Sequence, residues 1–311
     1  MKFTLRRLRY RAARTRLSVP LIWLRHRGLD SRDVFLASYP RSGQHWARFQ
    51  LFEILMCRPP DFDNLDDTIP VVGRHNQAPS ILPGEGRLIQ THQQWRREYK
   101  KAILLVRDVR DVVLSDYAWD ESLDLTKYLD IGDFDDYLLP WLMGETQTPG
   151  AGSWQDHLYT WLDSPLAGNG NLLVIRFEDM RLNTEEALVH MVEFLGAPVD
   201  RAAIRDAISN NSLERMRTKE DASKKYDPQR LGRKSGEEHR FIRKGSVGGW
   251  HERLTDAQVQ LVEQYAGKGL ARLGYPTGGP LSKQETNVRF GGSLSNLITP
   301  TNSPAPIEPP A

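Results

Sequence analysis

The chain has 311 residues and carries 42 Lys and Arg against 40 Asp and Glu, a formal net charge of +2. A chain of this length can bury roughly 75% of its unfolded surface, so it needs no covalent staples to hold a core. Its single cysteine, Cys57, excludes an internal disulfide and a zinc site built from cysteines. The small net charge gives no indication of a nucleic-acid partner. No apolar run reaches the roughly 18 residues of a membrane span.

The first 28 residues are strongly basic, with nine Lys and Arg and no acidic residue before Asp30. One interpretation is a segment that contacts anionic lipid. The other, which we favour, is a solvated helix that packs on the domain through Leu5, Leu8, Leu17 and Trp23. The apolar stretch 19–24 follows most of the positive charge and lacks a cleavage site, so a secretory signal is not expected. We expect a cytoplasmic protein, in agreement with the lone cysteine, with any membrane contact being peripheral and made by residues 1–28.

Four short apolar runs are typical of buried parallel strands. They cover residues 33–37, 87–90, 102–106 and 172–176. Helical spacing of apolar residues follows the first, third and fourth runs, and Asn183 is a candidate cap for the last of these helices. Such alternation predicts an α/β fold, a three-layer sandwich around a central parallel sheet, in which ligands bind beyond the carboxyl ends of the strands.

The predicted domain organisation has three parts. Residues 1–30 form the basic N-terminal segment and residues 31–275 form the main domain. Residues 276–311 are rich in Pro, Gly, Ser and Asn and have little apolar content. They cannot bury enough surface to offset the entropy of ordering, so we predict a disordered tail.

The loop after the first predicted strand has the features of a phosphate cradle. Residues 38–46 read SYPRSGQHW and lead into a helix. A strand–loop–helix turn directs backbone N–H groups and the positive end of the helix dipole at one place. Arg41 adds a full charge, and Gly43 lets a ligand approach the backbone. The G-x-x-x-x-G-K-[ST] spacing of a Walker loop is absent.

Six sequence blocks, in order along the chain, resemble motifs of sulfotransferases that use 3′-phosphoadenosine 5′-phosphosulfate. Residues 39–46, YPRSGQHW, resemble Y-P-[KR]-S-G-[TN]-T-W. The other five are Thr91-His92 (K-T-H), residues 107–115 (R-[DN]-x-[KR]-D-x-x-x-S), 176–180 (Y-E-D-[ML]), 211–216 (S-[FL]-x-x-M) and 241–250 (F-x-R-K-G-x-x-G-[DE]-W). Six blocks in order are far more specific than one motif. The resemblance implies the P-loop NTPase-like sulfotransferase fold over residues 31–275.

The resemblance also implies a reaction, the transfer of a sulfuryl group from the phosphosulfate to an acceptor hydroxyl or amine. His92 matches the family's general base, and a histidine of near-neutral pKa suits that role. Arg41 stands where cytosolic members carry a catalytic Lys, and it would stabilise the leaving phosphate. Gln90 replaces the Lys of K-T-H, which removes a positive charge near the sulfuryl group.

The same blocks imply the residues that bind the nucleotide. The 5′ side would be held by the first loop, and Trp46 would stack on adenine. The 3′-phosphate would be held by Arg107 and Ser115 together with the last block. Gln44, His45 and Phe177 depart from the usual residues of the family. The predicted set is Arg41, Ser42, Gly43, Gln44, His45, Trp46, Arg107, Ser115, Phe177, Ser212, Arg243, Lys244 and Gly245. No metal is expected, because the eight His show no ligand spacing.

The acceptor is not defined by the sequence. Residues 116–165 are dense in acids and contain four of the eight Trp. Either they line a site for a sugar or amphipathic acceptor, or they are core Trp and solvated acidic faces, which we favour for most of them. A small-molecule, lipid or carbohydrate acceptor is expected, and the oligomeric state stays open. Two alternative functions remain, a P-loop kinase of a small molecule and a non-catalytic nucleotide-binding or membrane-associated relative.

Overall fold

The computed structural model describes residues 19–128, 132–147, 150–231, 233–234 and 236–278. Its sheet has four parallel strands in the order β2-β1-β3-β4. The strands are β1 (Val34–Ser38), β2 (Leu88–Thr91), β3 (Lys101–Val106) and β4 (Leu172–Arg176). Each lies within one residue of the run that predicted it.

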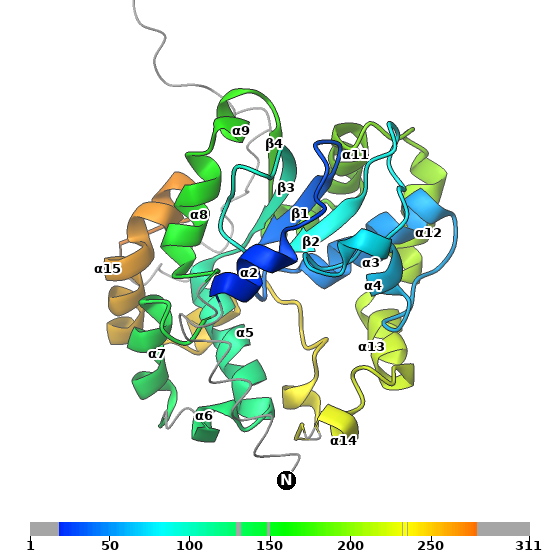
Figure 1. The fold of residues 1–311 in the computed structure, drawn as a ribbon. Coiled ribbons are helices and arrows are strands. Elements are labelled where there is room, and N and C mark those ends of the chain that lie inside the picture. The colour runs from blue at the N-terminus through cyan, green and yellow to red at the C-terminus, as the bar shows by residue number, and fades with distance from the viewer. Residues whose placement is uncertain (1–18, 129–131, 148–149, 232, 235, 279–311) are drawn as a thin grey trace, which may run out of the picture.

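Helices cover both faces of this sheet, as Figure 1 shows. One face is covered by α5 (Val109–Ser122), α7 (Phe134–Leu142), α8 (Trp154–Leu162), α9 (Pro165–Gly168) and α15 (Asp256–Arg272). The other is covered by α3 (Gln44–Met56), α4 (Leu65–Thr68), α10 (Phe177–Leu182), α11 (Thr184–Phe194), α12 (Arg201–Asn210) and α13 (Leu213–Ala222). The remaining described helices are α2 (Val19–Arg25), α6 (Leu125–Tyr128), α14 (Pro228–Leu231), η2 (His75–Gln77), η3 (Glu237–His239) and η4 (Gly249–Glu252). The predicted three-layer α/β sandwich is confirmed.

The continuous apolar runs follow from burial of the sheet on both faces. Successive side chains of a strand point to opposite faces. In β1, Phe35 and Ala37 pack in the cluster under α8 and α15, whereas Val34 and Leu36 pack in the cluster under α3 and α11. Because neither face meets water, no polar residue alternates with them.

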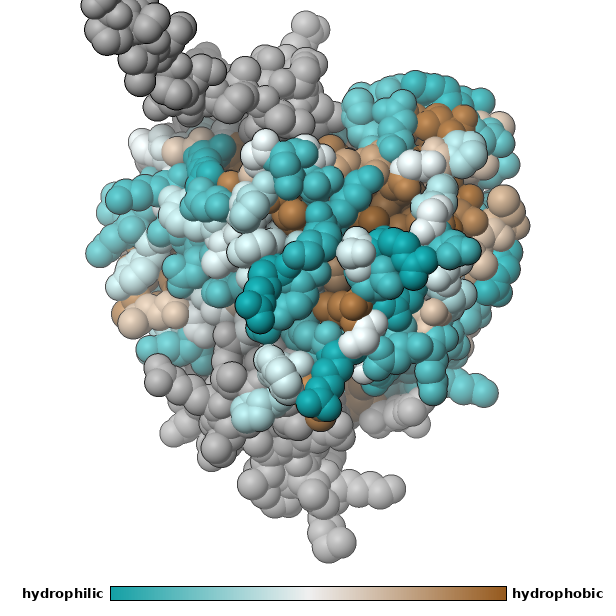
Figure 2. Space-filling model, turned by 45° about the horizontal axis from the view of Figure 1, so that its top comes forward, coloured by the Kyte–Doolittle hydropathy of each residue, from teal (hydrophilic) through white to brown (hydrophobic). Residues whose placement is uncertain are grey.

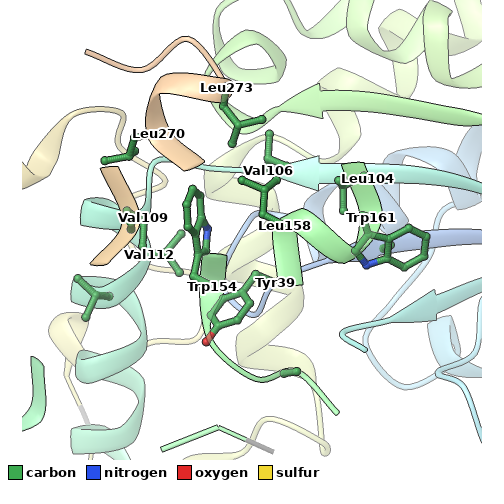
Figure 3. Packing of buried hydrophobic residues seen from close by; sticks show 14 of the residues in the cluster. Tyr39, Leu104, Val106, Val109, Val112, Trp154, Leu158, Trp161, Leu270 and Leu273 are labelled. Carbon is green, nitrogen blue, oxygen red and sulfur yellow. The ribbon is translucent and has the colours of Figure 1, made fainter. Parts of the chain in front are cut away.

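The first of these clusters contains three of the four Trp of residues 116–165, for which the sequence allowed either an acceptor site or the core. Trp141, Trp154 and Trp161 are at most 3% exposed, and Figure 3 shows the last two packed among aliphatic side chains of β3, α5, α8 and α15. Two of these indoles donate a hydrogen bond: Trp161 Nε1 to the Gln93 carbonyl at 3.1 Å, and Trp141 Nε1 to the Asp116 carboxylate at 2.8 Å. These three residues are core, as the favoured interpretation has it.

The N-terminal part departs from the favoured interpretation at its one testable residue. Trp23 in α2 is 58% exposed and lies under the Arg27 guanidinium, 5.1 Å away, instead of packing on the domain. Leu5, Leu8 and Leu17 lie outside the described residues, as does most of the predicted tail. Among described helices, none is long and apolar enough to cross a bilayer. On the face in Figure 2, hydrophilic side chains cover most of the described surface and apolar ones appear in patches between them.

The strand order determines where a ligand site is expected. From β1 the chain moves to β2 on one side, and then passes back to β3 on the other side of β1. Such a reversal opens a crevice at the carboxyl ends of the two central strands. Arg41 follows β1 and Arg107 follows β3, so both lie at this edge.

Burial of His157 in α8 makes stability depend on pH. The residue is 2% exposed, and burial, with the nearby His92, lowers its pKa to about 3. The unfolded chain titrates near the usual 6.5 and therefore binds more protons between pH 6.5 and about 3. We expect the free energy of unfolding to fall as pH drops through this window, by at most about 1.4 kcal/mol per pH unit from this residue.

Urea unfolding at pH 5.0 and 7.5 measures this effect. His157→Gln should lose much of the wild-type difference between the two pH values. His190→Gln, at a half-exposed histidine of α11, is the matched control and should keep it. Equal pH dependence in wild type and His157→Gln would show that burial of His157 does not set it.

Candidate active site

A cavity of about 730 Å³ lies at the carboxyl edge of the sheet. It brings together residues from seven separate parts of the chain. From the predicted set it is lined by Arg41, Gly43, Gln44, His45, Trp46, His92, Arg107, Ser115, Phe177, Arg243, Lys244 and Gly245. We call it the central cavity. Its lining covers all but two of the residues that the sequence nominated.

The first loop owes its shape to two residues with positive φ. Gly43 has φ 86°, and a Cβ there would lie 2.5 Å from the ring of Phe177, so only glycine fits. Arg41 has φ 67°, a conformation uncommon for a side chain-bearing residue, and its carbonyl accepts from Arg107 Nη1 at 3.1 Å. Helix α3 begins at Gln44, which directs its free N–H groups toward the loop.

Arg41 is fixed from several sides. Its Nε donates to Ser115 Oγ at 3.2 Å, and its guanidinium lies 5.3 Å from the ring of Trp119 and 5.1 Å from that of Phe241. Burial lowers the pKa of Arg41 from its ordinary value. An arginine still carries its charge at neutral pH, so a fixed cation faces the cavity.

His92 is held at both ring nitrogens. Nδ1 lies 2.9 Å from the Ser38 carbonyl, and Nε2 lies 3.1 Å from Nε2 of Gln90. The Gln90 side chain is oriented in turn by Arg48, whose Nη1 donates to its Oε1 at 2.5 Å. Because an arginine only donates, the Gln90 amide must present its N–H to His92.

This chain of contacts assigns the tautomer of His92. Nε2 accepts from Gln90, so Nδ1 carries the proton and donates to the Ser38 carbonyl. Burial lowers the pKa of His92, opposed by the Ser38 carbonyl and assisted by the charge of Arg48. The ring is therefore neutral at pH 7, with its lone pair on Nε2.

Backbone groups of the last block are fixed by buried side chains. Glu220 of α13, 3% exposed, accepts from the N–H groups of Phe241 and Ile242 at 2.8 and 2.9 Å. One turn earlier, Arg217 donates to the Arg243 carbonyl at 2.7 Å. Arg107 Nη2 donates to the Ser246 carbonyl at 3.0 Å, which ties this segment to the first loop.

Three of the nominated side chains are buried or bonded within the protein. Ser42 is 1% exposed and does not line the cavity, and Ser212 caps α13 by accepting from the Arg215 N–H. The Gln44 amide donates to the carbonyls of Leu36 and Thr91, at 2.6 and 3.2 Å, and so turns into the sheet.

The cavity also contains residues that the sequence did not nominate. Arg181 places its guanidinium 5.3 Å from the Trp46 ring. Its position four residues after Phe177, on the same face of a helix, was the available signal. Asp116 lines the cavity while its Oδ2 accepts from Trp141 and Gln147, at 2.8 and 2.6 Å. In the described part of the chain, no group of three or more His, Cys, Asp or Glu is arranged to hold a metal.

The sulfotransferase domain family matches residues 31–274. The chain belongs to this family, and the predicted fold and class of enzyme, a sulfotransferase, are confirmed.

Individual relatives are distant in sequence. Human sulfotransferase 2B1 is 28% identical over 249 residues, which cover 75% of this chain and 64% of the relative. Mouse sulfotransferase 1E1 is 23% identical over 258 residues, which cover 75% of this chain and 81% of the relative. The structural match to mouse sulfotransferase SULT7A1 complexed with PAP has a TM-score of 0.56 at 22% identity, over 78% of this chain and 84% of that one. Retinol dehydratase in complex with androsterone and PAP has a TM-score of 0.57 at 20% identity, over 78% and 81%.

Proposed function

We propose that this protein transfers a sulfuryl group from 3′-phosphoadenosine 5′-phosphosulfate to a hydroxyl, or an amine, of a small molecule. The observation that carries the proposal is the joint placement of a neutral base, His92, and a fixed cation, Arg41, in one cavity with Arg107, Ser115 and Arg243. The acceptor could be a lipid or a carbohydrate. Relatives support a small molecule, since retinol dehydratase has been solved with androsterone and with retinol.

His92 takes the proton in this mechanism. As the acceptor oxygen forms its bond to sulfur, the hydroxyl proton passes to Nε2, while the bond from sulfur to the bridging phosphate oxygen breaks. The electron pair of that bond leaves on the phosphate, where Arg41 stabilises the developing charge. The acceptor hydroxyl must first replace the Gln90 N–H at Nε2, which is an exchange of one hydrogen bond for another.

The nucleotide would be held at two ends. Backbone N–H groups of the first loop and of α3 suit the 5′-phosphate. Arg107, Ser115 and Arg243 suit the 3′-phosphate, because charged donors bind phosphate most strongly. Trp46, whose ring lies near Arg181 and Phe177, would lie against the base.

Donor binding is the direct test of this function. We expect 3′-phosphoadenosine 5′-phosphate to raise the melting temperature in the absence of magnesium, and ATP to do so much less. A ligand at 100 times its dissociation constant adds about 2.7 kcal/mol to the free energy of unfolding. Thermal unfolding with each nucleotide, with and without magnesium, measures the difference.

The same measurement separates the alternatives. A kinase would respond to ATP with magnesium at least as strongly, which would exclude our assignment. A non-catalytic relative would bind the nucleotide and fail to sulfate any hydroxyl acceptor in a panel. Binding without magnesium, followed by turnover, supports the transferase.

A further inference from the structure

A second hollow, of about 550 Å³, adjoins the central cavity. Four cationic side chains and a single carboxylate line it, and we call it the cationic pocket. Its lining is Arg25, His45, Arg48, Asp66, Val71, Val72, Gly73, Arg74, Gln90, Lys225 and Tyr226. These come from α2, α3, α4, β2 and two loops, so the pocket is formed by tertiary structure and not by one basic run of sequence.

The carboxylate does not neutralise the pocket. Asp66 accepts from Arg48 at 2.7 Å and from Lys225 at 2.5 Å. Burial opposes its ionisation, but these two cations outweigh burial and lower the pKa of Asp66 to about 2. Arg74 lies 3.7 Å from the same carboxylate with 73% of its side chain exposed. One negative charge is thus shared among three cations, and Arg25 adds a fourth.

Close packing brings Arg25 into this pocket. Gly73 has φ 99°, and a Cβ there would lie 2.8 Å from Cγ of Arg25. The aliphatic stem of Arg25 therefore lies against the backbone of the loop that precedes β2. Any other residue at position 73 would push the arginine away, in addition to straining the backbone.

The cationic pocket reaches the proposed base through a shared wall. Gln90 lines it and places its amide 3.1 Å from Nε2 of His92. His45 lines both cavities, and its Nε2 lies 3.3 Å from the hydroxyl of Tyr226. Arg107 and Arg243, proposed for the nucleotide, do not line it. A ligand in this pocket would therefore approach His92 from the side of Gln90.

We propose that the acceptor carries an anionic group, a carboxylate, sulfate or phosphate ester, which the cationic pocket binds through Arg25, Arg74 and Lys225 while a hydroxyl of the acceptor reaches His92. The inference rests on the proposed function and narrows its substrate class. Four cations around one carboxylate favour an anion over a neutral ligand, since buried or half-buried charge is stabilised by an opposite charge.

Two pairs of probes test this, each comparing a carboxylate with a neutral group at the same position. The first is 4-nitrophenyl β-D-glucuronide against the corresponding glucoside, and the second is cholate against methyl cholate. Calorimetry is run on the full chain saturated with 3′-phosphoadenosine 5′-phosphate. We expect the carboxylate member of at least one pair to bind tenfold or more tightly than its neutral partner, and the preference to weaken as salt is added.

The variants are chosen so that the fold survives. Arg25→Gln with Arg74→Gln removes two exposed charges, whereas Arg48 is avoided because it supports Asp66 and Gln90 from inside. The double variant should lose most of the preference for the anion and keep its affinity for the neutral partner. Arg97→Gln with Arg205→Gln, at exposed arginines outside both cavities, is the control and should keep it.

Failure of this inference differs from failure of the proposed function. Equal affinity within both pairs, or an equal effect of the control variant, would overturn the anionic acceptor while nucleotide binding persists. Absence of nucleotide binding would instead overturn the transferase assignment itself.

Discussion

Replacing His92 with alanine is expected to abolish turnover with a hydroxyl acceptor while donor affinity changes only a few-fold. A general base typically contributes about 10²–10⁴-fold to the rate. The ring accepts at Nε2 and donates at Nδ1 to the Ser38 carbonyl, so alanine removes the proton acceptor without removing a ligand of the nucleotide. Steady-state turnover and calorimetry with 3′-phosphoadenosine 5′-phosphate measure the two quantities separately. Near-normal turnover in the variant would mean that His92 is structural.

A companion to that experiment is Gln90→Glu, which keeps the size of the side chain. A carboxylate offers no N–H to Nε2, so the ring would bond it only by carrying a proton there. In wild type the pKa of His92 is lowered from its usual value of about 6.5, so the base stays unprotonated at neutral pH. The limb where activity falls on acidification should therefore lie below that pH in wild type and move to higher pH in Gln90→Glu. An unmoved limb would separate Gln90 from the base.

Replacing the arginines proposed to bind the 3′-phosphate should weaken the binding of one nucleotide and not of the other. We expect Arg107→Ala and Arg243→Ala each to lower the affinity for 3′-phosphoadenosine 5′-phosphate by tenfold or more. Charged hydrogen bonds to a phosphate are worth about 1.5–3 kcal/mol each. Adenosine 5′-phosphate lacks the 3′ group, so its weaker binding should barely change. Calorimetry with both nucleotides gives the comparison.

The second nucleotide also serves as the control for folding. Arg107 holds the carbonyls of Arg41 and Ser246, so its loss could loosen both loops. General loosening would weaken the two nucleotides alike. Equal losses in a folded variant would therefore show that these arginines support the walls of the cavity and do not bind the 3′-phosphate. Arg181→Ala, at another cation of the cavity, tests whether any positive charge would serve.

Much of the fold could be predicted because its signals are local. The strands are continuous apolar runs since both faces of the sheet are buried, and their boundaries differ by one residue at most. Asn183 does stand at the N-cap of α11, but its side chain makes no capping bond there. The prediction used residue type, whereas the bond depends on a backbone conformation that the preceding helix α10 imposes.

The sequence motifs predicted which residues line the candidate site. They could not predict the contacts that form between distant parts of the chain. Twelve of the predicted residues line one cavity, because the ends of parallel strands meet at one edge. The direction of the Gln44 amide could not be foreseen, since it depends on carbonyls of β1 and β2. The cationic pocket was equally hidden, because Arg25, Arg74 and Lys225 lie far apart in sequence and no motif joins them.

The contact between Gln90 and Arg48 restricts which single substitutions these two positions can accept. The Lys of the family motif is missing at position 90, yet a buried guanidinium lies 2.5 Å from the residue that replaced it. Restoring lysine alone would set a second cation against the buried guanidinium of Arg48. Removing Arg48 alone would leave Asp66 without a buried partner. Each single replacement is therefore expected to destabilise the fold, whereas a change at both positions would keep the buried charges paired.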